Sequence, residues 1–176
     1  MNPLLNRMIR AAKFDVSLYE EVEADTTATQ QAVIVVVLSS LASGIGALAF
    51  GQPVNFVIGT IGSLIGWYIW AYMIYLIGTK ILPEPQTKAD HGELLRTLGF
   101  AAAPGILRVL GIIAPLTSIV FTISNFWMLA TMVIAIRQAL DYQKTWRAVL
   151  VCVIGWAIQI AVLSIFLSLA GVGSGG

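Results

Sequence analysis

The chain has 176 residues, of which 58% are hydrophobic and only 11% are charged. Soluble domains carry about 25% charged residues, so this composition is typical of a chain embedded in lipid. A net charge of +1 argues against a nucleic-acid partner, and a single His with a single Cys, Cys152, excludes a zinc site of three or four nitrogen or sulfur ligands. We therefore expect a membrane protein without a metal or another cofactor.

Residues 1–31 precede the first apolar run and are predicted to form a cytoplasmic juxtamembrane segment. Apolar residues recur at helical spacing among Arg7, Arg10 and Lys13, which is the pattern of a basic amphipathic helix lying on a membrane surface. A second short helix is expected to follow, with Ser17 as its cap. Its acids offer two interpretations, a solvated surface or a docking surface for a soluble cytoplasmic partner. These acids are Glu20, Glu21, Glu23 and Asp25.

Two apolar runs follow, and each is long enough to cross a membrane. The first span is predicted over residues 32–50, which at about 1.5 Å per residue covers roughly the 30 Å hydrocarbon core. After a tight turn over residues 51–53, the second span is predicted over residues 54–79. Small residues in both spans predict a close helix hairpin. They are Ser40, Ala42, Gly44 and Gly46 in the first span and Gly59, Gly62, Ser63 and Gly66 in the second.

The inner half of the second span is aromatic. Tyr68, Tyr72 and Tyr75 fall on one helical face, with Trp67 beside them. One interpretation is core packing that grades into an interfacial aromatic belt. The other is a groove formed by these four residues for a lipid tail, a quinone or a pigment ring.

A polar loop over residues 80–96 holds the only histidine, His91. Asp90 is expected to cap the helix that follows. His91 beside Asp90 and Glu93 offers two interpretations, a metal or acid–base cluster and a solvated helix start. We favour the helix start, because two carboxylates and one imidazole are a sparse ligand set.

The third span, predicted over residues 94–114, holds Pro104 and Gly105 near its middle. Proline removes a backbone donor and glycine loosens the chain, so a kinked or broken helix is expected there. Arg108 follows one turn later, roughly 9 Å below the outer boundary at helical rise. A charge at that depth costs about 3 kcal/mol on insertion scales. Three interpretations stay open: Arg108 snorkels to outer-leaflet phosphates, hydrogen-bonds to Asn125 of the next span, or binds a substrate or lipid headgroup.

The fourth and fifth spans are predicted over residues 117–136 and 148–170. A polar loop over residues 137–147 separates them, and residues 171–176 are expected to form a flexible tail after a transmembrane domain that spans residues 32–170.

Charge predicts the orientation of these spans. Nine of the ten Lys and Arg residues lie in residues 1–31 and in the loops 80–96 and 137–147, three in each. Cytoplasmic segments of membrane proteins are enriched in these residues. The sequence therefore predicts an all-α bundle of five transmembrane helices with a cytoplasmic N-terminus and the C-terminus outside.

The chain contains, in this order, SLYEEVEAD, GTKILPEPQTKADHGELLRTLGFAAAPGILRVLG and VIAIRQALDYQKTWRAV. These segments resemble the bacterial members of the Yip1 family of five-span membrane proteins, and LLRTLGFAAAPGILRVLG is the most specific of them. The resemblance covers the chain from about Arg10 to Leu169. It implies five spans with a cytoplasmic N-terminus, here in a bacterial plasma membrane. Eukaryotic relatives associate with Rab-type GTPases in vesicle traffic, a role without a literal counterpart in a bacterium.

No catalytic constellation stands out in the sequence, neither a Ser/His/Asp set nor a Gly-rich phosphate loop nor paired intramembrane carboxylates. We therefore expect a non-enzymatic scaffold or adaptor that organises the membrane or partner proteins. Its expected partners are membrane lipids and either other membrane proteins or further copies of itself. One alternative is an accessory subunit of a larger respiratory or photosynthetic complex. Another is a small transporter or channel that uses Arg108 at the broken span.

Overall fold

The structure, a computed structural model, describes residues 2–51 and 54–169. Every regular element in these two ranges is helical, and five helical segments are long and apolar enough to cross a membrane. The prediction of an all-α bundle with five transmembrane helices is therefore confirmed. The predicted tail, residues 171–176, lies outside the described residues.

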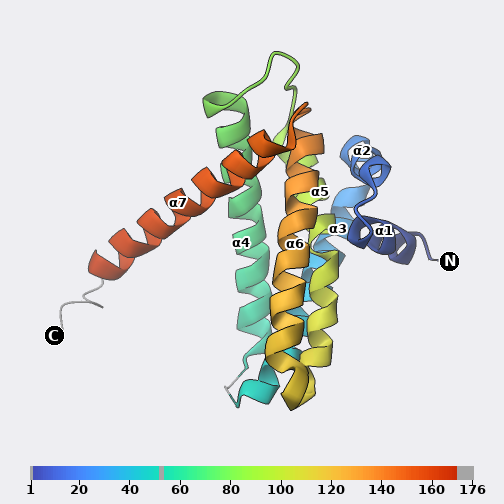
Figure 1. The fold of residues 1–176 in the computed structure, drawn as a ribbon, viewed down its shortest axis with the longest axis vertical. Helices are drawn as coiled ribbons and strands as arrows, with labels where there is room; N and C mark the ends of the chain where they lie inside the picture. The colour runs from blue at the N-terminus through green and yellow to red at the C-terminus, as the bar shows by residue number, and fades with distance from the viewer. Residues whose placement is uncertain (1, 52–53, 170–176) are drawn as a thin grey trace.

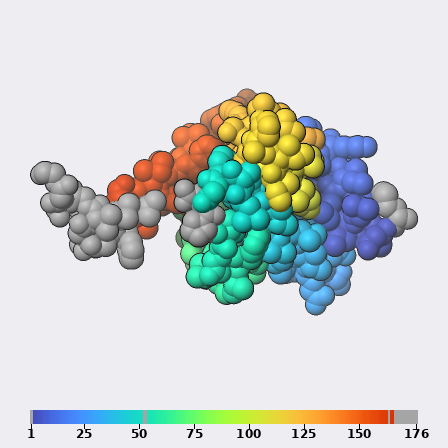
Figure 2. Space-filling view, turned by 90° about the horizontal axis from the view of Figure 1, so that it is seen from below, coloured from blue at the N-terminus to red at the C-terminus, as the bar shows by residue number. Residues whose placement is uncertain are grey.

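Four of the long helices stand side by side, and the fifth leaves them (Figure 1). The four are α3 (Ala28–Ala47), α4 (Phe56–Leu76), α5 (His91–Ala101) and α6 (Thr117–Ala139). The last helix, α7 (Thr145–Leu169), starts beside α6 and then diverges from the bundle. Figure 2 shows α7 projecting beyond the packed side chains of the other helices.

The loops that follow α4 and α6 meet at one end of the bundle, which we call the polar-loop end. The Thr87 hydroxyl donates to the Leu140 carbonyl at 2.8 Å, and Arg147 forms an ion pair with Glu84 at 2.9 Å. A π-helical turn, η2 (Ile77–Ile81), extends α4 into this end. These contacts fix the starts of α5 and α7 relative to each other.

Two short helices pack against the side of the bundle away from α7 (Figure 1). They are α1 (Pro3–Ala12) and α2 (Val16–Ala24). The Trp127 indole of α6 donates to the Ala12 carbonyl at 2.7 Å. Trp127 is about 18 Å along α6 from Ala139 at helical rise. Helix α1 therefore contacts the middle of α6 rather than its end.

The arginines of α1 form ion pairs with carboxylates in and beside α2. Arg7 forms ion pairs with Glu21 and Asp25, both at 2.8 Å, and Arg10 pairs with Asp15 at 2.7 Å and with Glu21 at 2.5 Å. Carboxylates within the chain therefore pair with both arginines of this amphipathic helix, and the sequence did not predict these ion pairs.

The cap of α2 differs from the one that the sequence predicts. Asp15 is the cap, and its side chain accepts from the Ser17 backbone at 3.0 Å. Ser17 lies inside the helix, where its hydroxyl donates to Asp15 at 2.7 Å. A carboxylate two residues upstream competes successfully for the first free N–H groups of the helix.

The third span starts and breaks where the sequence predicts. Asp90 caps α5, and its side chain and that of Glu93 form a capping box. The α-helix ends at Ala101, and a 3₁₀ segment, η3 (Ala103–Ile112), carries the chain onward with Pro104 in its first turn. Proline is tolerated there because the N–H that it lacks has no helical acceptor. The Ala101 carbonyl accepts instead from the Thr131 hydroxyl of α6 at 2.8 Å.

The first two spans pack against each other as the sequence predicts, with the Ser63 hydroxyl donating to Ser40 at 3.0 Å, but the glycines of α4 do not line the contact. A Cβ atom built on Gly59, Gly62 or Gly66 of α4 would meet nothing within 4 Å. On α3, by contrast, a Cβ atom at Gly46 would lie 2.0 Å from the Arg108 carbonyl oxygen in η3. The closest backbone approach to α3 therefore comes from the broken third span and not from the glycines of α4.

Candidate functional site

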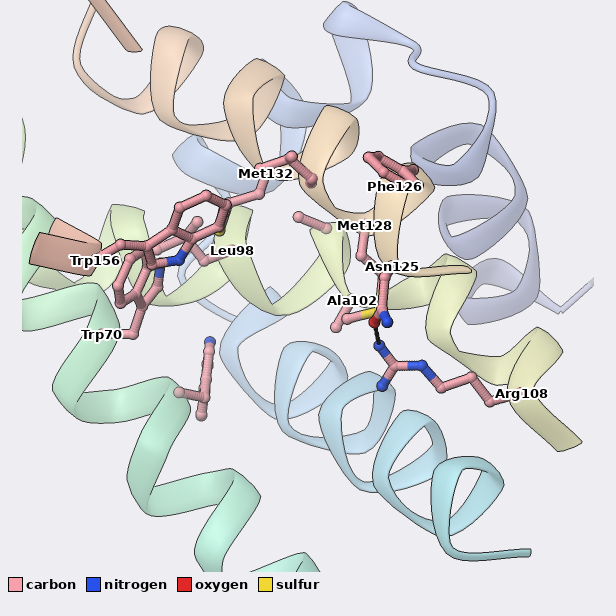
Figure 3. Close-up of a pocket in the computed structure, with 12 residues that line it drawn as sticks. Trp70, Leu98, Ala102, Arg108, Asn125, Phe126, Met128, Met132 and Trp156 are labelled. Atoms are coloured by element: carbon pink, nitrogen blue, oxygen red, sulfur yellow. Dashed lines mark hydrogen bonds between the residues drawn. The ribbon is translucent and has the colours of Figure 1, made fainter. Parts of the chain in front are cut away.

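Arg108 points into the bundle and meets Asn125 (Figure 3). Its Nη2 atom donates to the Asn125 side-chain oxygen, and its guanidinium carbon lies 5.7 Å from the centre of the Phe121 ring. The Nε atom is buried and has no hydrogen-bond partner within the described part of the chain. None of the ion pairs found in residues 2–51 and 54–169 includes Arg108. The guanidinium charge therefore faces neutral groups.

A tight reversal brings these two residues together. A short 3₁₀ turn, η4 (Ala114–Leu116), links η3 to α6, so the two segments run in opposite directions. The Thr117 hydroxyl closes the reversal by donating to the Gly111 carbonyl at 2.6 Å. Arg108 and Asn125 consequently face each other across the antiparallel pair, and the structure joins the two residues that the sequence singled out.

The other two residues of the predicted polar site, Pro104 and Gly105, lie beside this contact and are both buried. A Cβ atom on Gly105 would lie 2.0 Å from the Ser39 hydroxyl oxygen and 2.9 Å from the Met128 sulfur. Gly105 therefore lets α3 and α6 approach the break from both sides. The four predicted residues form one region around the end of α5.

An apolar cavity of about 420 Å³ opens on one side of Arg108 (Figure 3). It lies among α4, α5, α6 and α7, with Arg108 and Asn125 at one end and Trp70 and Trp156 at the other. We call it the tryptophan chamber. Its remaining lining is almost entirely apolar and includes Trp67, Leu98, Ala102, Phe126, Met128 and Met132.

A second cavity of about 280 Å³ opens on the other side of Arg108, between α3 and α4. Hydroxyl groups give it a polar character, and we call it the serine cavity. A third cavity of about 210 Å³ shares part of this lining and extends past Asn55 toward the end of the bundle opposite the polar loops. The hydroxyl groups of the serine cavity belong to Ser39, Ser40, Ser43 and Ser63.

The aromatic face of α4 is filled by a side chain of the chain itself. The His91 ring lies edge-on to Tyr68, Tyr72 and Tyr75, with ring centres 4.8, 5.4 and 6.4 Å apart. Trp67 points elsewhere, because its indole donates to the Leu95 carbonyl at 3.2 Å and lines the tryptophan chamber. The structure therefore does not bring the four residues of the predicted ring groove together.

The residue that the sequence missed is Arg96. The sequence places it in a polar loop, but it lies on the buried face of α5 and is only 6% exposed. Its Nε atom donates to the Val22 carbonyl at 2.8 Å, and its Nη2 atom donates to the Glu23 carbonyl. Arg96 thus caps the last turn of α2. One signal in the sequence could have indicated its burial. Arg96 lies one helical turn before Phe100, on the apolar face of the helix start.

The acids proposed as a docking surface have different surroundings. Glu21 and Asp25 are engaged by Arg7 and Arg10, as described above. Burial raises the pKa of Glu23 to about 7, and the nearby charges of Glu93, Asp141 and Glu20 add to the rise while Arg96 opposes it. Of these four acids, Glu20 alone is both exposed and free of an ion pair to any described residue.

The chain matches a known protein family over most of its length. A family model described as the Yip1 domain matches residues 17–166, which takes in α2 and nearly all of the membrane-spanning part. No curated protein matches the chain, and no solved structure matches it.

Proposed function

This chain belongs to the Yip1 domain family, and from this premise we propose that it is a non-enzymatic scaffold that gathers other membrane proteins through its last helix. We further propose that it lies in a bacterial plasma membrane with its polar-loop end in the cytoplasm. The orientation rests on the Lys and Arg residues that gather in the segments at that end.

The observation that carries the proposal is the divergence of α7 (Figure 1). The helix touches α4 near Gly155, where a Cβ atom would lie 3.1 Å from the Trp70 ring. Beyond this crossing, large apolar side chains of α7 remain exposed, among them Ile158, Ile160 and Val162. The bundle therefore leaves both sides of a membrane helix open to another protein.

The exposed part of α7 carries one polar amide side chain. Gln159 is exposed, and its amide forms no hydrogen bond within the part of the chain that the structure describes. An amide surrounded by hydrocarbon is costly, and side chains of this kind join transmembrane helices by hydrogen bonds across the interface. A partner helix seated on α7 would satisfy Gln159 and cover its apolar neighbours.

A photo-reactive residue at position 160 tests the proposal in living cells. Replacing Ile160 in this way is expected to give protein adducts, whereas the same replacement of Ile123, an exposed residue of α6, gives none. Adding Gln159→Leu is expected to lower the adduct yield several-fold, because the interhelical hydrogen bond is lost. Gln30→Leu, which removes an exposed amide from α3, serves as the matched control.

The mass of the adduct identifies the partner class. Twice the mass of this chain shows a homo-oligomer, and a heavier fixed composition shows an accessory subunit of a larger complex. Adducts with lipid alone at position 160, together with a solitary monomer in mild detergent, would refute the scaffold proposal.

A further inference from the structure

Arg108 stands between two cavities of opposite character, and both of them reach its side chain. We propose that together they bind one membrane phospholipid, with the phosphodiester at Arg108 and an acyl chain in the tryptophan chamber. The site is built mainly from α3, α4, α5, η3 and α6, with Trp156 of α7 at the far end of the chamber. The proposal goes beyond the scaffold role, because it rests on Arg108 and the two cavities and not on Gln159 and its exposed neighbours on α7.

The three cavities adjoin one another. Trp67, Ala102, Arg108 and Met128 line both the tryptophan chamber and the serine cavity. The serine cavity in turn shares three serines with the third cavity, which extends to Asn55 at the end of α4 opposite the polar loops. A headgroup can therefore reach Arg108 along the gap between α3 and α4 while its chain extends past Ala102. The shared serines are Ser40, Ser43 and Ser63.

Charge selects an anion for the middle of this path. Asn125 offers Arg108 a neutral oxygen, and the Phe121 ring offers only its face, so neither compensates the charge. The buried Nε atom still lacks an acceptor among the described residues. A phosphodiester supplies two acceptor oxygens with a negative charge and matches the forked guanidinium. The neighbouring hydroxyl groups of the serine cavity can donate to the same oxygens.

The tryptophan chamber selects an apolar chain rather than a second polar group. Its volume of about 420 Å³ lies in the lower half of the range of small-molecule pockets, about 300–1,000 Å³. Met128 and Met132 line it, and methionine side chains adapt to irregular apolar shapes. Free phosphate would leave this chamber unfilled, and a neutral lipid would leave Arg108 without a counter-charge. A phospholipid supplies both the counter-charge for Arg108 and an apolar chain for the chamber.

Quenching of tryptophan fluorescence measures this binding, because Trp67, Trp70 and Trp156 line the chamber. The delipidated full-length protein in detergent is titrated with phosphatidylglycerol that carries brominated acyl chains. We expect saturable quenching that unbrominated phosphatidylglycerol reverses and that neither diacylglycerol nor inorganic phosphate reverses. Arg108→Gln keeps a donor for Asn125 but removes the charge, and it should raise the half-quenching concentration about tenfold or more.

Two further variants separate the site from general effects. Lys13→Gln removes the same charge from an exposed position and should leave the titration unchanged. Ala102→Phe places a ring at the junction of the two cavities and should abolish quenching while Arg108 remains; it decides the matter if Arg108→Gln fails to fold. Equal quenching by brominated diacylglycerol, reversal by inorganic phosphate, or unchanged titration of Arg108→Gln or Ala102→Phe in folded protein would overturn the proposal.

Discussion

Gly46→Ala is expected to remove most of the folded protein. The added methyl group would lie 2.0 Å from the Arg108 carbonyl oxygen and 2.9 Å from the Phe121 ring, far inside van der Waals contact. A backbone carbonyl cannot move aside as a flexible side chain can, so α3 and η3 must separate. Overpacking of a core costs typically about 1–3 kcal/mol, and a clash with backbone lies at the upper end of that range or above it.

The yield of monodisperse protein after purification in mild detergent, with the thermal midpoint, measures this effect. Gly59→Ala is the matched control, because it adds the same methyl group to a transmembrane helix where nothing lies within 4 Å. We expect the control to behave as wild type. Equal yields and midpoints for the two variants would show that α3 and η3 are not packed as described.

Arg96→Leu is expected to release the two N-terminal helices from the bundle. The buried guanidinium donates to the Val22 and Glu23 carbonyls at the end of α2, and leucine leaves both without these donors. A buried polar group that loses its partner costs about 1–3 kcal/mol. With two carbonyls affected, this change should be the most damaging single substitution of a charged residue.

Hydrogen exchange of α1 and α2 detects the release directly. We expect the amides of these helices to exchange several-fold faster in Arg96→Leu while those of α6 keep their protection. Lys88→Leu provides the comparison, since it removes one positive charge from an exposed loop position. Unchanged exchange in Arg96→Leu would mean that the Trp127 bond to Ala12 is sufficient to hold α1 and α2 in place.

Features that depend on local chemistry could be predicted from the sequence. Five apolar runs predict five membrane helices because lipid requires helical backbone over a fixed thickness. The cap at Asp90 and the break at Pro104 follow from backbone donors that are present or missing within a few residues. The same reasoning places Arg108 at a depth in the membrane where a charged side chain needs a polar or charged partner.

Features that depend on which helix faces which could not be predicted. The glycines of α4 looked like a packing surface, yet the close approach occurs between Gly46 and η3. His91 looked like part of a solvated helix start, yet its ring fills the tyrosine face of α4. Arg96 looked like a charged loop residue, yet its side chain donates to a backbone carbonyl of α2. Each of these contacts joins segments that are distant in the chain.

The central claim is that the broken third span directs Arg108 to Asn125 of the next helix, and not outward to the headgroup layer of the surrounding bilayer. A double-mutant cycle of Arg108→Leu and Asn125→Leu, read as free energies of unfolding in detergent, tests it most directly. Asn125→Leu should be costly only while Arg108 is present, with a coupling of about 1 kcal/mol or more. Additive effects, within about 0.5 kcal/mol, would contradict the claim and return Arg108 to the membrane surface.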